Sequence, residues 1–373
     1  MKVLQIIDTL GLGGAETLIS NLCPRLVRLG VESSVMCLTS RRSDLAQKLE
    51  RAGIQVLYSP WSSPYCPLQP LFIASHLRQT HFDLVHVHLF PAQLWTIFGA
   101  RLVRWEVPLV TTEHSTWNRR RRLPLRRVDR WMYSAYTRVA CIGSTTELAL
   151  RDWLGPMPLR TTIIQNGIDL TAFAAATERQ SALADPNPVC RILCVASLTE
   201  RKDHATLLRA ISQLPGAELH LVGSGPLRGA LERLTANLRI TDRVHFLGER
   251  LDIAELLAGA DIYVQPSRWE GFGIAALEAM ATGLPVVASN VPGLREVVGD
   301  AGVLFEPGSD SELRDRLDHL MSSSSARHDL GSRARVRAHH FSVDMTAAAY
   351  HSMYSSVVNQ GEHFKARPEV YPV

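Results

Sequence analysis

Short β-branched runs alternate with longer helical patterns along most of this chain, in two successive series. Such alternation predicts parallel sheets, because a crossover between parallel strands needs a dozen or more residues and is usually a helix. The first series of expected strands is Val3–Ile7, Ser34–Leu38, Gln55–Tyr58, Leu84–His88, Leu109–Thr112 and Arg138–Cys141. The second series is Arg191–Ala196, Glu218–Val222, Val244–Leu247, Ile262–Gln265, Pro285–Ala288 and Val303–Phe305. The expected fold class is therefore α/β, with two doubly wound domains.

The length of 373 residues suits two cores rather than one. We expect a Rossmann-like domain at 1–172, a second one at 189–342, and a C-terminal helix at 343–358 that packs back on the first domain. The segment from Thr171 to Pro188 is rich in Ala, Pro and small polar residues and has no strong periodicity. It is expected to be an interdomain linker.

Composition indicates a globular protein, with 46% hydrophobic and 20% charged residues. The six cysteines show no CxxC pair and no zinc-ligand spacing, which favours reduced thiols. The first residues start a strand directly and lack the layout of a signal peptide. Arg101, Arg104 and Glu106 interrupt the longest apolar stretches, so no segment is expected to span a bilayer. We expect a cytoplasmic protein, at most peripheral at the inner face of the membrane.

A glycine-rich turn, Asp8–Glu16, follows the first expected strand and opens a helix. Gly13 and Gly14 would let an anion approach the helix N-terminus, where free N–H groups and the dipole favour negative charge. Glu16 occupies the third glycine position of the dinucleotide fingerprint, so NAD binding is disfavoured. A turn that needs glycine for geometry alone is the open alternative.

A second motif, Pro266–Met280, follows the strand Ile262–Gln265 and runs into an apolar helix. Gly271 and Gly273 would expose backbone N–H groups at the start of this helix, which suits a diphosphate or sugar hydroxyls. Glu278 interrupts the apolar helix, and a buried carboxylate is costly unless it is paired. A ribose diol would satisfy it with two O–H donors; a nearby arginine is the alternative.

A third motif, Ser197–Asp203, follows the strand Arg191–Ala196. Basic residues at strand ends of an open α/β sheet point into the ligand crevice, so Arg201 and Lys202 are candidates to neutralise a diphosphate. Two adjacent cations in a loop can equally be solvated surface. The loop Gly223–Pro226 has the same placement after the next strand and is a candidate to approach a nucleotide.

Together these motifs resemble family 4 of the glycosyltransferases. The resemblance runs from Gly13 to about Asp310 and is strongest over Asp261–Pro307, where Glu270 and Glu278 stand with seven residues between them. It also includes the sequences Asp83–His88, Asn166–Asp169, Val222–Leu227, Ala281–Ala288 and Val291–Val298. The resemblance implies retaining enzymes with the GT-B fold, in which two Rossmann-like domains face each other across a cleft.

The resemblance also implies residue roles. Glu278 should hold the ribose hydroxyls, Glu270 should orient the donor sugar, and Lys202 should stabilise the departing diphosphate. Ser197 stands where the family usually has an arginine, and Arg201 is the candidate substitute. The implied catalytic set is Glu270, Lys202, Arg201 and His114, the last touching donor sugar or acceptor. The implied donor-binding set is Gly13, Gly14, Ser197, Gly223, Gly225, Gly271, Phe272, Gly273, Ile274 and Glu278.

The expected partners are a nucleotide-sugar donor, linked to UDP or GDP, and a glycan or lipid-linked acceptor. Preorganised cations and helix N–H groups can stabilise the leaving diphosphate, and no convincing metal-chelating Asp-x-Asp loop is present, so neither a metal nor another cofactor is expected. The alternatives are a non-catalytic nucleotide-sugar-binding subunit, an epimerase of the same fold, or a phosphorylase, for which no cofactor lysine site is found.

Arginines crowd the segment before the helix expected near Val128–Ala135. The members are Arg119, Arg120, Arg121, Arg122, Arg126 and Arg127. Their apolar and aromatic interruptions suit an anionic membrane surface, at about 1 kcal/mol per cation. A solvated loop, or one that grips an anionic soluble acceptor, is the alternative. Nucleic acid is not an expected partner, because no motif that reads RNA or DNA accompanies the arginines.

Overall fold

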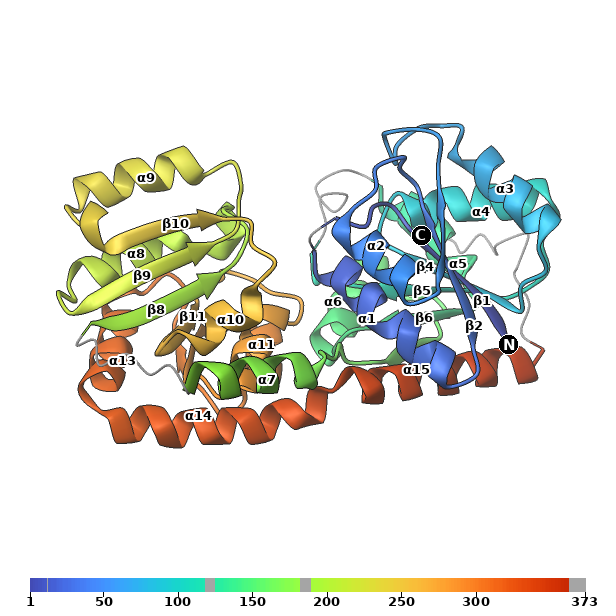
Figure 1. Cartoon of the computed structure of the whole chain (residues 1–373). Helices are drawn as coiled ribbons and strands as arrows, with labels where there is room; N and C mark the ends of the chain where they lie inside the picture. Colours follow the sequence, from blue (N-terminus) through green and yellow to red (C-terminus); the bar gives the residue numbers. More distant parts are fainter. Residues whose placement is uncertain (12, 118–124, 182–188, 362–373) are drawn as a thin grey trace. The chain divides into compact units, whose positions relative to one another are not determined.

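The structure is a computed structural model that describes residues 1–11, 13–117, 125–181 and 189–361. The chain divides into two compact units (Figure 1). Unit 1 contains Met1–Gly167 and the C-terminal segment that begins at Val343, and unit 2 contains Ile168–Ser342. Each unit is built on one parallel sheet, which confirms the expected α/β class.

Unit 1 holds a seven-stranded parallel sheet in the order β3-β2-β1-β4-β5-β6-β7. The strands are β1 (Lys2–Ile7), β2 (Glu32–Cys37), β3 (Gln55–Tyr58), β4 (Leu84–His88), β5 (Leu109–Glu113), β6 (Arg138–Cys141) and β7 (Thr161–Ile163). The helices are α1 (Gly14–Arg28), α2 (Asp44–Arg51), α3 (Gln69–Gln79), α4 (Ala92–Leu102), α5 (Arg126–Ser134), α6 (Ser144–Leu154) and α15 (Val343–Asn359). Strand β7 was not foreseen, because three partly exposed residues carry little apolar pattern.

The core of unit 1 forms on both faces of its sheet. Strand β1 is buried along nearly its whole length, as expected of a central strand covered by helices on both sides. Helix α15 packs on α1 and buries Tyr350 and Tyr354 in a cluster that includes Val3 and Leu22. Helix α15 and the first strand of the chain therefore share one core cluster.

Unit 2 holds a six-stranded parallel sheet in the order β10-β9-β8-β11-β12-β13. The strands are β8 (Cys190–Val195), β9 (Ala217–Val222), β10 (Val244–Gly248), β11 (Ile262–Gln265), β12 (Val286–Ser289) and β13 (Val303–Phe305). The helices are α7 (Leu170–Ser181), α8 (His204–Ser212), α9 (Arg228–Asn237), α10 (Ile253–Ala258), α11 (Ile274–Thr282), α12 (Pro292–Val298), α13 (Asp310–Ser322) and α14 (Ser324–Ala338).

The segment expected to be an aperiodic linker begins as a helix. Helix α7 packs on α10 and α11 within unit 2 and buries Phe173 and Ala176. These two residues lie three apart, which places them on one helical face, and the surrounding alanines favour helix strongly. The linker prediction was therefore wrong for 171–181, and its remaining part, 182–188, lies outside the described residues.

Both sheets reverse their strand order at one point, between β1 and β4 in unit 1 and between β8 and β11 in unit 2. Chain connections leave such a point in opposite directions, so a crevice opens outside the carboxyl ends of the two strands, where ligands bind in open α/β sheets. The segments after β8 and β11 carry Lys202 and Glu270.

Candidate active site

The switch point of unit 2 brings Lys202 and Glu270 into contact. Lys202 stands in a short 3-10 turn after β8, and Glu270 stands in the loop after β11. The ammonium Nζ donates a hydrogen bond to Glu270 Oε2, and each side chain is only 12% exposed. The structure therefore joins two residues whose predicted roles concern the same donor molecule.

Glu270 is an ionised carboxylate held in place by cations. Burial opposes its charge, but the charges of Lys202 and Arg201, together with hydrogen bonds from Lys202 and the Gly271 N–H, outweigh this and lower the pKa of Glu270. An ionised carboxylate accepts hydrogen bonds only, so Glu270 can receive them from hydroxyl groups of a sugar.

A buried polar chain along β11 fixes the position of Glu270. Tyr263, Gln265 and Ser267 alternate along the chain and lie on one face of the strand and its extension. Tyr263 Oη donates to Gln265 Oε1 at 2.6 Å, and Gln265 Nε2 donates to Ser267 Oγ at 2.9 Å. Ser267 Oγ then donates to Glu270 Oε2 at 3.4 Å. Sequence reasoning missed this support, whose signal is three polar residues at period 2 in an otherwise apolar strand.

Glu278 lies one turn inside α11 and is only partly exposed. Burial raises the pKa of Glu278 to about 7. Within the described parts of the chain, no hydrogen bond or ion pair to its carboxylate is found, so the arginine-paired alternative is not what the structure contains. A partly exposed carboxylate without a protein partner among the described residues can accept from the two hydroxyl groups of a ribose diol.

Glycine sets the backbone conformation of the turn into α11. Gly273 has φ +103°, which favours glycine, and a Cβ there would lie 2.5 Å from Leu294 Cδ2. The ring of Phe272 is buried and packs against Phe341 with centroids 5.7 Å apart, so Phe272 can meet a ligand only through its main chain. No side chain caps the N-terminus of α11, which leaves N–H groups for an anion.

Arg201 and Ser197 lie at the carboxyl end of β8. Ser197 is exposed, and Arg201 is half-buried beside the Lys202–Glu270 pair. Among the described residues, the Arg201 guanidinium has no hydrogen-bond partner, while its backbone carbonyl accepts from Arg268 N at 2.8 Å. Arg268 in turn pairs with buried Asp203 at 3.3 Å, which ties the loop after β11 to the loop after β8.

Gly223 and Gly225 have a structural reason to be glycine. A Cβ on Gly223 would lie 2.2 Å from the carbonyl oxygen of Ala196, and one on Gly225 would lie 2.5 Å from that of Leu198. The loop after β9 therefore packs directly on the loop after β8. Their predicted contact with a nucleotide stays a prediction.

The switch point of unit 1 carries the glycine turn and two carboxylates. Gly13 is extended, and a Cβ there would lie 2.4 Å from Glu16 Oε2, so glycine leaves space for the folded-back carboxylate. Burial raises the pKa of Glu16 and raises that of Asp8 to about 7, with the charge of Glu16 adding to the latter. Gly14 is exposed at the start of α1. The carboxyl group of Glu16 thus lies at the N-terminus of α1, beside the glycine turn.

His114 follows β5 and belongs to a buried polar network in unit 1. His114 Nε2 lies 3.1 Å from His88 Nδ1, and His88 Nε2 lies 2.9 Å from Gln5 Oε1. Gln5 Nε2 donates to the hydroxyl of Tyr354 on α15 at 3.2 Å. Burial lowers the pKa of His114 to about 4, so its imidazole is neutral at physiological pH. Sequence reasoning missed Gln5 and Tyr354, which are 349 positions apart.

The arginine-rich segment is described only from residue 125 onward, so Arg119, Arg120, Arg121 and Arg122 lie outside the described residues. Arg126 and Arg127 are exposed at the start of α5. Arg130 instead donates to the carbonyls of Leu154 and Pro156, at the end of α6.

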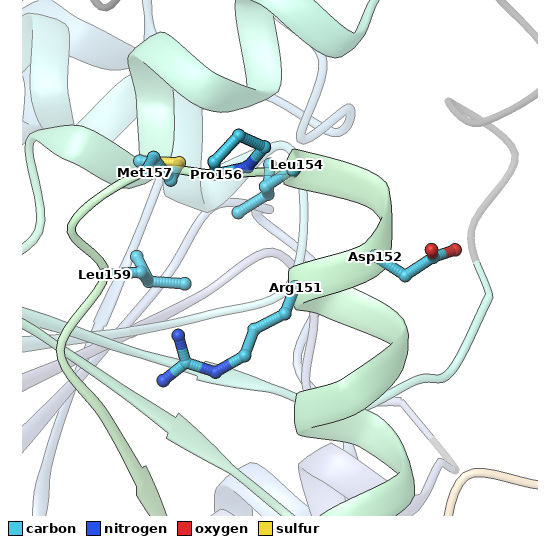
Figure 2. A pocket seen from close by; sticks show the side chains of 7 residues that line it. Arg151, Asp152, Leu154, Pro156, Met157 and Leu159 are labelled. Carbon is cyan, nitrogen blue, oxygen red and sulfur yellow. The ribbon is translucent and has the colours of Figure 1, made fainter.

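These two carbonyls border a hollow of about 390 Å³ around the C-terminus of α6. In Figure 2 apolar side chains and Arg151 line this hollow, while Asp152 points away on the other side of the helix. Arg151 is bonded to Glu147 and Thr161, and cations near a helix C-terminus are favourable. Arg130 and Arg151 thus have structural partners, which leaves Arg126 and Arg127 as the described candidates for an acceptor or membrane.

Two family models cover most of the chain: glycosyltransferase family 4 matches residues 12–172, and glycosyl transferases group 1 matches residues 177–337. The D-inositol 3-phosphate glycosyltransferase of Salinispora arenicola is 30% identical over 313 residues, which cover 74% of this chain and 69% of that protein. The chain belongs to glycosyltransferase family 4. The N-acetyl-α-D-glucosaminyl L-malate synthase of Bacillus anthracis is 36% identical over 152 residues, or 40% of each chain.

Solved structures agree with this family 4 assignment at the level of the fold. The crystal structure of Anabaena Alr3699/HepE in complex with UDP and glucose superimposes with a TM-score of 0.82 at 23% identity, covering 95% of this glycosyltransferase and 100% of that chain. The GT-B class predicted from the sequence is thereby confirmed. No helix in the described ranges is long and apolar enough to cross a membrane.

Proposed function

We propose that this glycosyltransferase takes a hexose-type sugar from a UDP- or GDP-linked donor and transfers it, with retention of configuration, to a glycan or lipid-linked acceptor. The observation that carries the donor assignment is the unpartnered Glu278, on the helix that follows the Lys202–Glu270 pair. A ribose diol supplies the two O–H donors that this carboxylate lacks. UDP and glucose are bound in the Anabaena relative, which supports the same class of donor.

The chemistry proposed for the site needs no catalytic metal. Negative charge develops on the diphosphate as the bond to the anomeric carbon breaks, and Lys202, Arg201 and the uncapped N-terminus of α11 are preorganised to stabilise it. Lys202 is already buried against Glu270 in the free protein, so a diphosphate that binds there would interact with an ammonium group that is already out of water. Retention would follow if the acceptor attacks on the face that the diphosphate leaves, with the leaving phosphate accepting the acceptor's proton.

The acceptor is proposed to be anionic and to lie near Arg126 and Arg127. The names of the two curated relatives contain L-malate and inositol 3-phosphate, both of which are anions. The same cations would bind the headgroup of a lipid-linked acceptor at the inner face of a membrane, in keeping with a cytoplasmic, peripheral protein. Flotation with anionic liposomes distinguishes a soluble anionic acceptor from a lipid-linked one, because only the lipid-linked acceptor requires the protein to bind liposomes.

The deciding experiment is calorimetric titration with UDP, GDP and ADP in the presence of EDTA, on wild type and Glu278→Ala. We expect one nucleotide to bind the wild type in the micromolar range and to lose its affinity in the variant. Transfer from the matching nucleotide-sugar, followed by NMR of the anomeric proton of the product, then tests retention. If none of the nucleotides binds, the donor assignment and the roles of Glu270 and Lys202 are wrong.

A further inference from the structure

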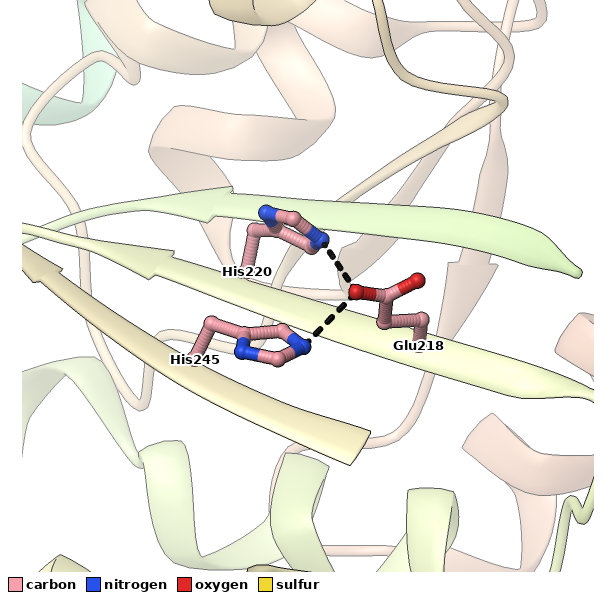
Figure 3. Close-up of side chains that lie close together, drawn as sticks. All are labelled: Glu218, His220 and His245. Carbon is pink, nitrogen blue, oxygen red and sulfur yellow. Dashed lines mark hydrogen bonds and ion pairs between the residues drawn. The ribbon is translucent and has the colours of Figure 1, made fainter. Parts of the chain in front are cut away.

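Three potential metal ligands converge on the edge of the unit 2 sheet (Figure 3). Glu218 and His220 belong to β9, and His245 belongs to the edge strand β10. Glu218 Oε1 lies 3.2 Å from His220 Nε2 and 2.7 Å from His245 Nε2. One ligand atom of each side chain lies within 4.8 Å of those of the other two.

Strand geometry explains the convergence. Glu218 and His220 are two residues apart, so their side chains lie on the same face of β9. His245 is paired in register with His220 across the two strands, and the imidazole centroids are 4.9 Å apart. Ordinary backbone pairing thus presents three ligands without any special loop.

Hydrogen bonds within the cluster leave one ring nitrogen, Nε2 of His245, without a hydrogen-bond partner among the described residues. His220 Nε2 has hydrogen-bond geometry toward Glu218 Oε1. The Nε2 atom of His245 is buried and, among the described residues, has no hydrogen-bond partner, although it lies 2.7 Å from the same oxygen. A ring nitrogen directed at this point without a hydrogen bond is placed as a metal ligand would be.

The spacing also suits a metal. Bonds of about 2.0–2.2 Å to nitrogen and oxygen in tetrahedral geometry put neighbouring ligand atoms roughly 3.3 Å apart. The pair of Glu218 and His220 already has this separation, and the pair of Glu218 and His245 needs to open by about half an ångström. Two imidazoles and one carboxylate select zinc and similar transition metals over magnesium or calcium, which prefer oxygen ligands.

We propose that Glu218, His220 and His245 bind a zinc ion, with water in the fourth position. The side chains of His245 and Glu218 are 39% and 27% exposed, which gives the ion a path from solvent. Arg191 is in register with Glu218 on β8, and its positive charge limits the affinity of the site. The ion links the edge strand β10 to β9 and stabilises unit 2.

This zinc site is separate from the candidate active site. Glu218 is the second residue of β9, whereas the residues proposed to bind the donor follow the carboxyl ends of the strands. The five positions from Glu218 to Gly223 correspond to about 16 Å along a strand. The proposal therefore concerns stability and leaves the metal-independent transfer chemistry unchanged.

The test uses the full chain, without a histidine tag, in calorimetric titration with zinc chloride and with magnesium chloride. Wild type is expected to bind one zinc ion and no magnesium, and its thermal midpoint is expected to rise with zinc concentration. Glu218→Gln and His245→Gln each remove a ligand, and we expect the zinc affinity to fall by more than about tenfold in both. His81→Gln is the matched control, because His81 also lies beside a carboxylate, 3.6 Å from Asp83, but belongs to no three-ligand group among the described residues.

Zinc binding that is lost in both ligand variants and kept in the control would establish the site. The apo forms of the two variants, compared by circular dichroism and thermal unfolding, show whether each is folded; two independent ligand changes guard against the failure of one. Absence of zinc binding in wild type, or equal binding in wild type and in folded ligand variants, would overturn the proposal.

Discussion

Replacing Glu278 with glutamine should stabilise the free protein in a strongly pH-dependent way. Burial raises the pKa of this carboxyl from 4.5 to about 7. A raised acid pKa means that the fold favours the protonated form, so the stability it contributes is full below about pH 4.5 and is lost as the pH rises through about 7. The free-energy penalty relative to the neutral form is about 1 kcal/mol at pH 5 and about 3 kcal/mol at pH 8. Glutamine is neutral at both.

The assay is urea unfolding of wild type and Glu278→Gln at about pH 5 and about pH 8, fitted with a common m-value. The variant is expected to gain about 2 kcal/mol more over wild type at the higher pH than at the lower. Glu232→Gln, on the exposed face of α9, is the matched control and should show no such difference. An equal effect of Glu278→Gln at both pH values would refute the reasoning.

Nucleoside binding should show the opposite trend with pH. Only the ionised carboxylate accepts both ribose hydroxyls, and its ionised fraction rises about tenfold between pH 6 and pH 8 for a pKa near 7. The affinity of wild type for the nucleoside should therefore rise about tenfold over this range, while that of Glu278→Gln stays low and flat. Uridine or guanosine is the better ligand here, because a phosphate group itself titrates near pH 6.

Three further results are expected. Lys202→Met should lower kcat of sugar transfer by about 10²–10³-fold, because it removes a preorganised cation at the leaving diphosphate, and should weaken nucleotide binding much less; steady-state kinetics beside calorimetry checks this. Gly223→Ala should destabilise by about 1–3 kcal/mol in thermal or urea unfolding, since its φ is +130° and its Cβ would meet a carbonyl at 2.2 Å, whereas Gly216→Ala, whose nearest neighbour is at 3.6 Å, should be close to neutral. The double variant Arg126→Glu, Arg127→Glu should weaken the binding free energy to anionic liposomes by about 1 kcal/mol or more per residue, measured by flotation, and leave nucleotide binding unchanged. If flotation is unaltered, these two residues have no role at a membrane.

Much of the fold and part of the site were predictable from local patterns. Buried parallel strands are short apolar runs separated by helical periodicity, so eleven of the expected strands match to within one residue at each end, and the twelfth, Ser34–Leu38, begins two residues after β2 does. Glu270, Glu278 and Lys202 were identifiable because each is a charged residue just after a strand or on an apolar helix. Alanine-rich α7 was missed because its apolar face is carried by only a few buried side chains.

The sequence by itself determined the class of fold, the family and the residues that carry charge near the ends of the strands. Only the tertiary structure decided which of these residues meet. The pairing of Lys202 with Glu270 depends on the adjacency of β8 and β11, and the convergence of Glu218 and His245 depends on the register of β9 with β10. It also decided that Glu278 has no partner among the described residues and that burial raises its pKa to about 7, since burial depends on how the helix packs. Periodicity is a local signal, whereas proximity and desolvation arise from strand order, register and packing between residues far apart in the chain.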